Sequence, residues 1–221
     1  NKVMNIVGNK RIDAGEQDVV ISLKNDNYIW EDNTREKLVY KFVIKKAEPD
    51  FYYYCDDTRV LYDGNYYGID CYVRPKNYND KITINIKYMD ENNNYVLYES
   101  PKFKEVGEYL VKYKIYSDSN HEEVFSENKV IIGGLDKNTG LEIKDNILIS
   151  KYKRLEDIKN NFKYFKDAEF ELADENNNVL QDKFIKTNYI LNIYSVTEYK
   201  TYKLSLLGDV NGDGKINSAD Y

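Results

Sequence analysis

The feature that most constrains the fold is a glycine followed by an alternating segment, a combination that occurs twice along the chain. The segments "DAGEQDVVISLKNDN" at 13–27 and "EVGEYLVKYKIYSDS" at 105–119 share it. Their glycines, Gly15 and Gly107, lie 92 positions apart. Alternation of apolar and polar residues with a period of two is typical of a half-buried strand. The sequence therefore predicts a repeated β-rich unit.

Further strands can be placed by the same alternation. Two closing strands are predicted, one with Tyr40, Phe42 and Ile44 and one with Val130 and Ile132. Between the two copies we expect strands at 52–55, 69–73, 82–88 and 95–98, separated by the turn segments 63–64, 75–77 and 90–94. Short strands at this spacing are typical of an immunoglobulin-like (Ig-like) sandwich. We predict a complete sandwich at 48–133 and only the C-terminal half of a preceding one at 1–47, poorly stable without its missing half.

Parity groups the apolar residues of each repeated strand on one face. One face carries Val19, Ile21 and Leu23 in the first copy, and the corresponding face in the second carries Tyr109, Val111, Tyr113 and Ile115.

Composition excludes several classes of protein. The 221 residues are 42% hydrophobic and include 23 Tyr, which favours β-structure and argues against disorder. A net charge of -6 without any Lys/Arg cluster argues against a nucleic-acid partner. No apolar run approaches the roughly 20 residues of a membrane-spanning helix. Cys55 and Cys71 lie in different predicted strands, and the sequence leaves open whether they form a disulfide or remain two small buried thiols.

The pattern changes after Gly134. A hairpin is predicted with Leu141 and Ile143 on one strand and Ile147 and Ile149 on the other. Leu155, Ile158 and Phe162 then follow at i, i+3 and i+7, which indicates one apolar stripe of a short helix. Strands are expected at 168–172, 189–194 and 201–206. These elements predict a small α+β module at 134–207.

The last residues have the spacing of a cation-binding loop. Counted from Asp209, oxygen-bearing side chains occupy positions 1, 3, 5, 9 and 12, namely Asp209, Asn211, Asp213, Asn217 and Asp220. Ca²⁺ prefers six to eight oxygen ligands, which a short loop supplies by wrapping around the ion. Lys215 would add its backbone carbonyl at position 7. Gly214 would permit a sharp bend, and Ile216 would pack the loop onto a core. The alternative is an ordinary Asn/Asp-rich turn, since "DENNN" occurs at 90–94 and 174–178 without this spacing.

Several segments resemble known bacterial modules. "LYDGNYYGIDCYV" and "SPKFKEVGEYLVKYKIY" resemble the Ig-like repeats called MBG-type, which occur in tandem in secreted and cell-surface proteins. "AGEQDVVISLKNDNYIWEDNTREKLVYKFVIKKA" resembles the second half of another such repeat. In layout, residues 134–207 are similar to the spacer modules that precede a dockerin in clostridial secreted proteins.

"GDVNGDGKINSADY", at 208–221, resembles the first calcium loop of a type I dockerin. That module attaches enzymes to cellulosome-type assemblies by binding a cohesin of a scaffoldin. The general calcium-loop signature ends in Glu, whereas this loop ends in Asp. The resemblance implies that the six residues named above hold Ca²⁺ and that Ser218 and Ala219 help to choose the cohesin. A dockerin has two such loops, so this chain with one is expected to bind Ca²⁺ weakly or not at all.

The residues favour a non-catalytic role. The single histidine, His121, lies in a polar loop where we expect it to be solvated, and no nucleophile elbow, P-loop or zinc spacing is present. We therefore expect the C-terminal region of an extracellular bacterial protein, with any polysaccharide-active domain upstream. The alternative is a cell-surface adhesin or stalk. The tyrosines of "FYYYC" and "YDGNYYG" could stack on sugars, although we expect them to be half-buried.

Overall fold

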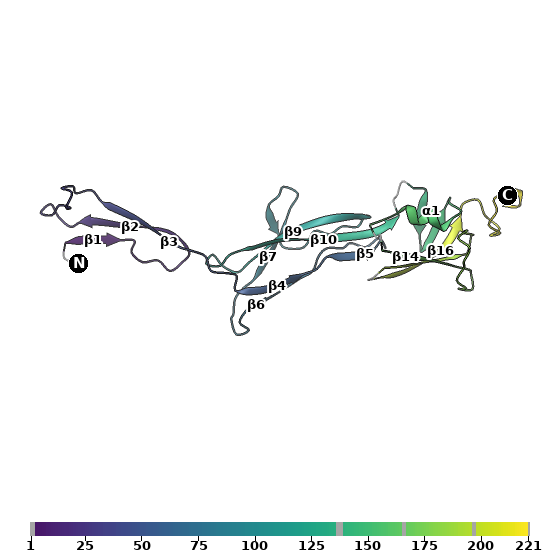
Figure 1. Ribbon diagram of the computed structural model, residues 1–221, viewed down its shortest axis with the longest axis horizontal. Helices are drawn as coiled ribbons and strands as arrows, with labels where there is room; N and C mark the ends of the chain where they lie inside the picture. Colours follow the sequence, from purple (N-terminus) through teal and green to yellow (C-terminus); the bar gives the residue numbers. More distant parts are fainter. Residues whose placement is uncertain (1–2, 136–138, 165–166, 196–197, 221) are drawn as a thin grey trace. The chain divides into compact units, whose positions relative to one another are not determined.

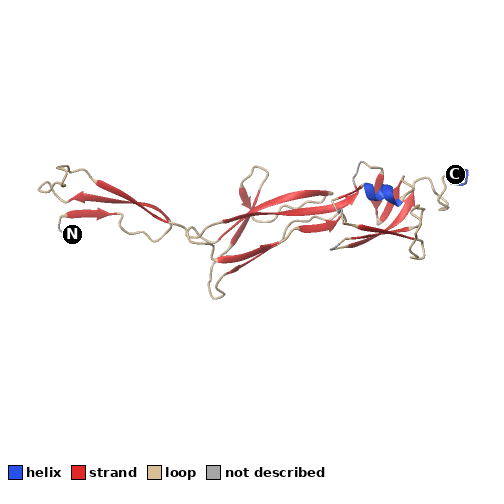
Figure 2. Ribbon diagram, viewed as in Figure 1, coloured by secondary structure: helices blue, strands red, loops and turns tan. Residues whose placement is uncertain are grey.

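The computed structural model describes residues 3–135, 139–164, 167–195 and 198–220, and it is mainly β. In these residues the helical elements are α1 (Leu155–Asn160) and a 3₁₀ turn at Ser218–Asp220, and the remaining regular structure is strand (Figure 2). The predicted mainly β class is confirmed. The Ig-like and dockerin assignments stay predictions.

The chain divides into two compact units. The first contains Asn1–Tyr54, Tyr72–Lys87 and Tyr113–Ser126, and the second contains Cys55–Cys71, Tyr88–Lys112 and Glu127–Tyr221. The long strands β9 (Gly107–Tyr116) and β10 (Val124–Leu135) contribute residues to both units. The predicted module boundaries at 47/48, 133/134 and 207/208 stay predictions.

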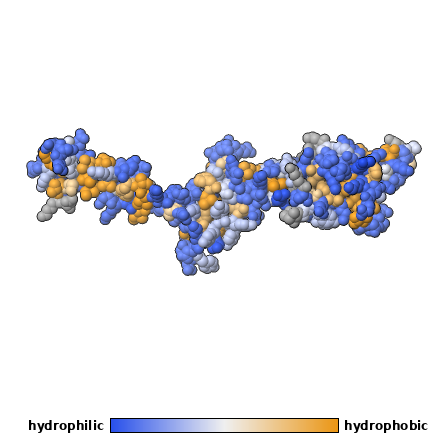
Figure 3. All heavy atoms as spheres, in the orientation of Figure 1, coloured by the Kyte–Doolittle hydropathy of each residue, from blue (hydrophilic) through white to orange (hydrophobic). Residues whose placement is uncertain are grey.

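The first unit begins with a three-stranded antiparallel sheet of β1 (Met4–Val7), β2 (Gly15–Leu23) and β3 (Leu38–Ile44), with β2 in the centre (Figure 1). The predicted strands β2 and β3 pair with Gly15 opposite Ile44. No side chain of residues 3–47 is buried. Apolar side chains such as Val7, Val39 and Val43 are exposed, and Figure 3 shows apolar colour on the surface of this part. An isolated sheet without a buried face is at best marginally stable.

The loop after β9 contacts the start of β2 within the first unit. The side chain of Asn120 accepts a hydrogen bond from the backbone N–H of Ala14 (2.7 Å) and donates one to Asp13 (3.0 Å). The backbone of Ala47 forms a bridge with that of His121. These polar contacts join the three-stranded sheet to a segment more than 70 residues further along the chain.

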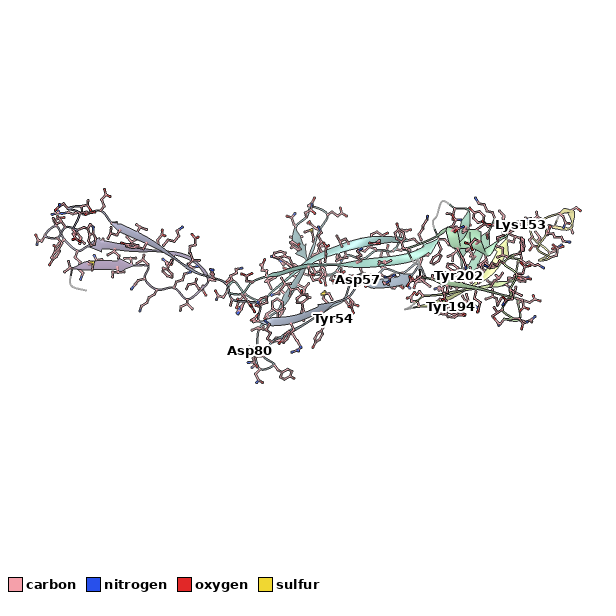
Figure 4. The ribbon with its side chains drawn as sticks, viewed as in Figure 1. Tyr54, Asp57, Asp80, Lys153, Tyr194 and Tyr202 are labelled. Carbon is pink, nitrogen blue, oxygen red and sulfur yellow. A yellow bond between two sulfur atoms is a disulfide. The ribbon has the colours of Figure 1, made fainter. Side chains whose placement is uncertain are left out.

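Strands β4 (Phe51–Cys55) and β6 (Cys71–Pro75) form a two-stranded sheet. The structure decides the question that the sequence left open, because Cys55 and Cys71 form a disulfide with a Cα–Cα distance of 4.3 Å. Figure 4 labels the neighbouring Tyr54. The half-buried prediction for the tyrosines is wrong in β4, since Tyr52, Tyr53 and Tyr54 are 43–64% exposed. Alternation identified the strand, but this narrow sheet leaves their side chains in solvent.

A larger sheet has the strand order β13-β10-β9-β7-β8, formed with β7 (Asn85–Met89), β8 (Tyr95–Leu97) and β13 (Phe162–Lys163). Of the four residues expected to share a face of β9, Val111, Tyr113 and Ile115 are buried, whereas Tyr109 is only partly buried. The prediction for 82–88 is partly wrong, since the strand begins at Asn85. Residues 82–84 continue the alternation, but they are not part of a paired strand.

The segment closed by the disulfide contains β5 (Thr58–Leu61), where no strand was predicted from the sequence. β5 runs parallel to β10, with Thr58 opposite Val130 and Leu61 opposite Gly133. Only the fold brings these two segments together, because a four-residue strand has too short a pattern to indicate its partner.

The C-terminal sheet has the order β11-β12-β16-β15-β14. Its strands are β11 (Leu141–Lys144), β12 (Ile147–Ser150), β14 (Glu169–Ala173), β15 (Ile190–Tyr194) and β16 (Tyr199–Leu206). The hairpin of β11 and β12 was predicted and is confirmed. Helix α1 buries Leu155 and Ile158 as expected, but it ends at Asn160, so Phe162 lies in β13 and not on the helix stripe.

One hydrophobic core runs through the second unit. Leu61 and Leu135 from β5 and β10 belong to the same buried cluster as Leu148, Ile158 and Leu204. β10 also pairs with β13, which places Leu135 opposite Phe162. The backbone N–H of Leu61 donates a 2.6 Å hydrogen bond to the Glu198 carboxylate. β10 therefore continues across the predicted boundary at 133/134, and residues on both sides of it share a core.

Candidate metal centre

The predicted calcium loop begins where β16 ends. The backbone N–H of Leu207 donates to Ser150 and that of Asp209 donates to Leu206, at 2.8 and 3.0 Å. Gly208 has a φ of 90°, a region that glycine adopts without strain. This turn takes the chain out of the sheet and directly into residues 209–220, the pale yellow end of the ribbon (Figure 1).

Asp209, the first predicted ligand, is only 2% exposed. One of its carboxylate oxygens accepts a hydrogen bond from the backbone N–H of Gly214 (3.1 Å). The other accepts from the backbone N–H of Thr187 (3.1 Å). A buried carboxylate requires such partners, because burial without them is costly. Asp209 therefore ties position 1 of the loop to position 6.

Two glycines bend the loop, of which the sequence predicted Gly214. Gly212 and Gly214 have φ values of 77° and 80°. A Cβ added at Gly214 would lie 2.7 Å from Cγ of Lys186, too close for a real side chain. Gly214 thus meets two requirements at once, a backbone conformation rarely adopted by other residues and a close approach to residue 186.

Asp220 closes the loop. One of its carboxylate oxygens accepts from the backbone N–H groups of Val210 (2.9 Å) and Asn211 (3.3 Å). The other accepts from the backbone N–H of Asn217 (2.8 Å). The hydrogen bond from Asn217 lowers the pKa of Asp220 most. Desolvation opposes it, and the bonds from Asn211 and Val210 lower the pKa further, so that it lies below its ordinary value. The two ends of the loop are therefore held together by a carboxylate that favours its charged form.

The middle ligands form local turns. Asn211 accepts from the backbone N–H of Asp213 (2.9 Å), and Asp213 accepts from that of Lys215 (2.7 Å). Asn217 accepts from the backbone N–H of Ala219 (2.9 Å). These three side chains are exposed, as are Lys215, Ser218 and Ala219.

The prediction for Ile216 is wrong. Its side chain is 43% exposed, so it does not pack the loop onto a core. It lies over Gly208, where an added Cβ would be 3.1 Å from one of its methyl groups. Asp209, five positions before Gly214, is the buried residue that contacts the preceding module.

The donor set fits a hard cation. It comprises three carboxylates, two amide oxygens and one backbone carbonyl, and such oxygens are the ligands that Ca²⁺ prefers. A carboxylate has about four acceptor positions, so the hydrogen bonds described above leave capacity on each. Among the described residues, no three His, Cys, Asp or Glu side chains are grouped as metal ligands. The ligand assignment stays a prediction.

His121, which was expected to be solvated, is partly buried: its side chain is 26% exposed, with Nδ1 2.9 Å from the Asp118 carboxylate. Sequence reasoning missed Thr187, which contacts Asp209. It lies 22 positions before the loop, in a segment without any motif, so no sequence signal indicated it.

In the part of the chain that the structure describes, no helix is long and apolar enough to cross a membrane.

Comparison of the chain with protein-family models and with curated proteins finds no match.

Proposed function

We propose that residues 208–221 are the first half of a calcium-dependent dockerin. Through it, an extracellular bacterial protein would attach to the cohesin of a scaffoldin. The Ig-like segments and the α+β module would act as non-catalytic spacers. The observation that carries the proposal is the hydrogen bonding of Asp209 and Asp220, which closes a loop whose oxygens have the spacing of a calcium site.

The proposed roles follow from the positions of the residues. Asp209, Asn211, Asp213, Asn217, Asp220 and the carbonyl of Lys215 would hold the ion. Bound Ca²⁺ supplies the positive charge that offsets the mutual repulsion of three carboxylates. The hydrogen bonds of Asp209 and Asp220 shape the loop, and the exposed Ser218 and Ala219 would contact the cohesin.

One feature supports an extracellular location. The disulfide between Cys55 and Cys71 is of a kind that persists in oxidising environments. We propose secretion, with a polysaccharide-active domain elsewhere in the parent protein.

One observation favours a second candidate, a surface adhesin or stalk that binds carbohydrate. Tyr52, Tyr54 and Tyr72 on β4 and β6 are each at least 50% exposed, and Arg74 lies 4.6 Å above the ring of Tyr52. Exposed aromatic groups of this kind often mark interaction sites. No feature of these tyrosines requires a calcium loop, so the two candidates differ in their dependence on Ca²⁺.

The test is cohesin binding by the protein extended through a second loop. We expect binding to a member of a cohesin panel in Ca²⁺, its loss in chelator, and at least a tenfold loss of affinity for Asp213→Ala. Asp80→Ala, in an exposed turn of the first unit (labelled in Figure 4), is the matched control and should bind normally. Binding that survives in chelator would refute the mechanism. Absence of any cohesin binding would favour the adhesin.

A further inference from the structure

The segment at 185–188 is fixed to the C-terminal module before it meets the loop. Ile185 is buried in the core, and its backbone N–H donates to Lys153 (3.0 Å). The backbone N–H of Asn188 donates to Leu204 on β16 (2.9 Å). Thr187 lies between these two anchored positions, so its own position follows that of the five-stranded sheet.

Thr187 makes three hydrogen bonds to the chain around the start of the loop. Its backbone N–H donates to the carboxylate of Asp209 (3.1 Å), and its hydroxyl donates to the Asp209 backbone carbonyl (2.9 Å). The same hydroxyl accepts from the backbone N–H of Leu206 (3.0 Å). One side chain therefore joins the last residue of β16 to the first predicted ligand.

The rest of this segment also lies against the first half of the loop. A Cβ added at Gly212 would lie 3.5 Å from the amide nitrogen of Asn188, and one added at Gly214 would meet Lys186. With its carboxylate held by Thr187 on one oxygen and by Gly214 on the other, Asp209 has little freedom to turn away. Partners that orient a ligand in this way typically change metal affinity by 10- to 100-fold when removed.

We propose that Thr187 is a positioning residue for the loop and that it couples metal occupancy to the stability of the five-stranded sheet. This inference rests on the proposed calcium site. Because coupling is reciprocal, an ion that favours the held position of Asp209 also favours the anchored state of Thr187 and Leu206. The spacer module would then be part of the site, because it sets the orientation of the first ligand.

The experiment measures Ca²⁺ binding with calorimetry on the protein extended through a second loop, using Ca²⁺ alone as the probe. Thr187→Val keeps the shape and the backbone N–H that holds the Asp209 carboxylate, but it removes the hydroxyl that bonds the backbones of Asp209 and Leu206. We expect the loss of these bonds to weaken binding about fivefold or more. Thr187→Ser restores the hydroxyl and should bind within about threefold of the wild type. Thr34→Val is the matched control, because Thr34 is an exposed threonine whose hydroxyl bonds the carboxylate of Asp32, two positions before it.

Hydrogen exchange provides a second readout that does not depend on affinity. Addition of Ca²⁺ should slow exchange of the Asn188 and Leu206 amides in the wild type and in Thr187→Ser, and less in Thr187→Val. Exchange in β15, measured in chelator, shows whether Thr187→Val still folds. If it does not, the wild-type shift and the serine variant still decide the question.

The outcomes separate this inference from the proposed function. A wild-type protein that takes up no Ca²⁺ would overturn both. Normal Ca²⁺ uptake with equal affinity in Thr187→Val, or without any Ca²⁺-dependent protection of Leu206, would overturn the coupling and leave the calcium site standing.

Discussion

Removal of the disulfide between Cys55 and Cys71 should lower the free energy of unfolding of the second unit by about 3 kcal/mol. The two residues are 16 positions apart, and closing a loop of this length removes roughly 3 kcal/mol of chain entropy from the unfolded state. The closed segment contributes buried Leu61 and Ile69 and the whole of β5. Without the disulfide, the chain would have to order this segment on folding with no covalent constraint on its two ends.

The assay is guanidinium unfolding followed by circular dichroism, comparing the wild type with a variant in which Cys55 and Cys71 are both alanine. We expect a lower midpoint for the variant. Reductant should shift the wild type by a similar amount and leave the variant unchanged, which serves as the control. A loss of less than about 1 kcal/mol, or a wild type insensitive to reductant, would refute the reasoning.

Two further predictions concern the core of the second unit. Ile158→Ala, at a position on α1 with no exposed surface, should cost about 2–5 kcal/mol of unfolding free energy, whereas Ile12→Ala, 92% exposed, should cost almost nothing; denaturant titration of both variants checks this. Burial, helped by the charges of Asp63 and Glu198, raises the pKa of Tyr202 (labelled in Figure 4) to about 12. Since the pKa of an unfolded tyrosine is about 10, this contribution is fully present below pH 10 and is lost as the pH rises towards 12, by about 3 kcal/mol in all. Tyr202→Phe should remove that part of the pH dependence, and an identical profile for both proteins would contradict the assignment.

Local patterns predicted the elements whose signal lies in residues a few positions apart. Alternation on β9 identified the face that buries Val111, Tyr113 and Ile115. The hairpin of β11 and β12 was found in the same way. Within the loop, Gly214 was expected at the bend because other residues rarely adopt its backbone conformation, and it has a φ of 80°.

The same patterns failed where a partner lies far away in the sequence. Alternation placed the start of the strand at 82–88 too early. It indicates which side chains share a face, but it does not indicate which residues pair with a neighbouring strand. β5 was missed because its partner β10 begins more than 60 residues later. The tyrosines of β4 were expected to be half-buried, yet the sheet that they join has only two strands.

The sequence by itself determined the mainly β class, the residues that share the apolar face of β9 and the oxygen spacing at 209–220, since each depends on residues a few positions apart. Only the tertiary structure decided that Cys55 and Cys71 are bonded, that β10 continues into the C-terminal core, and that Thr187 holds Asp209. Each of these depends on residues 16 or more positions apart in the sequence that the folded chain brings within a few ångströms, and no periodicity encodes such a distance.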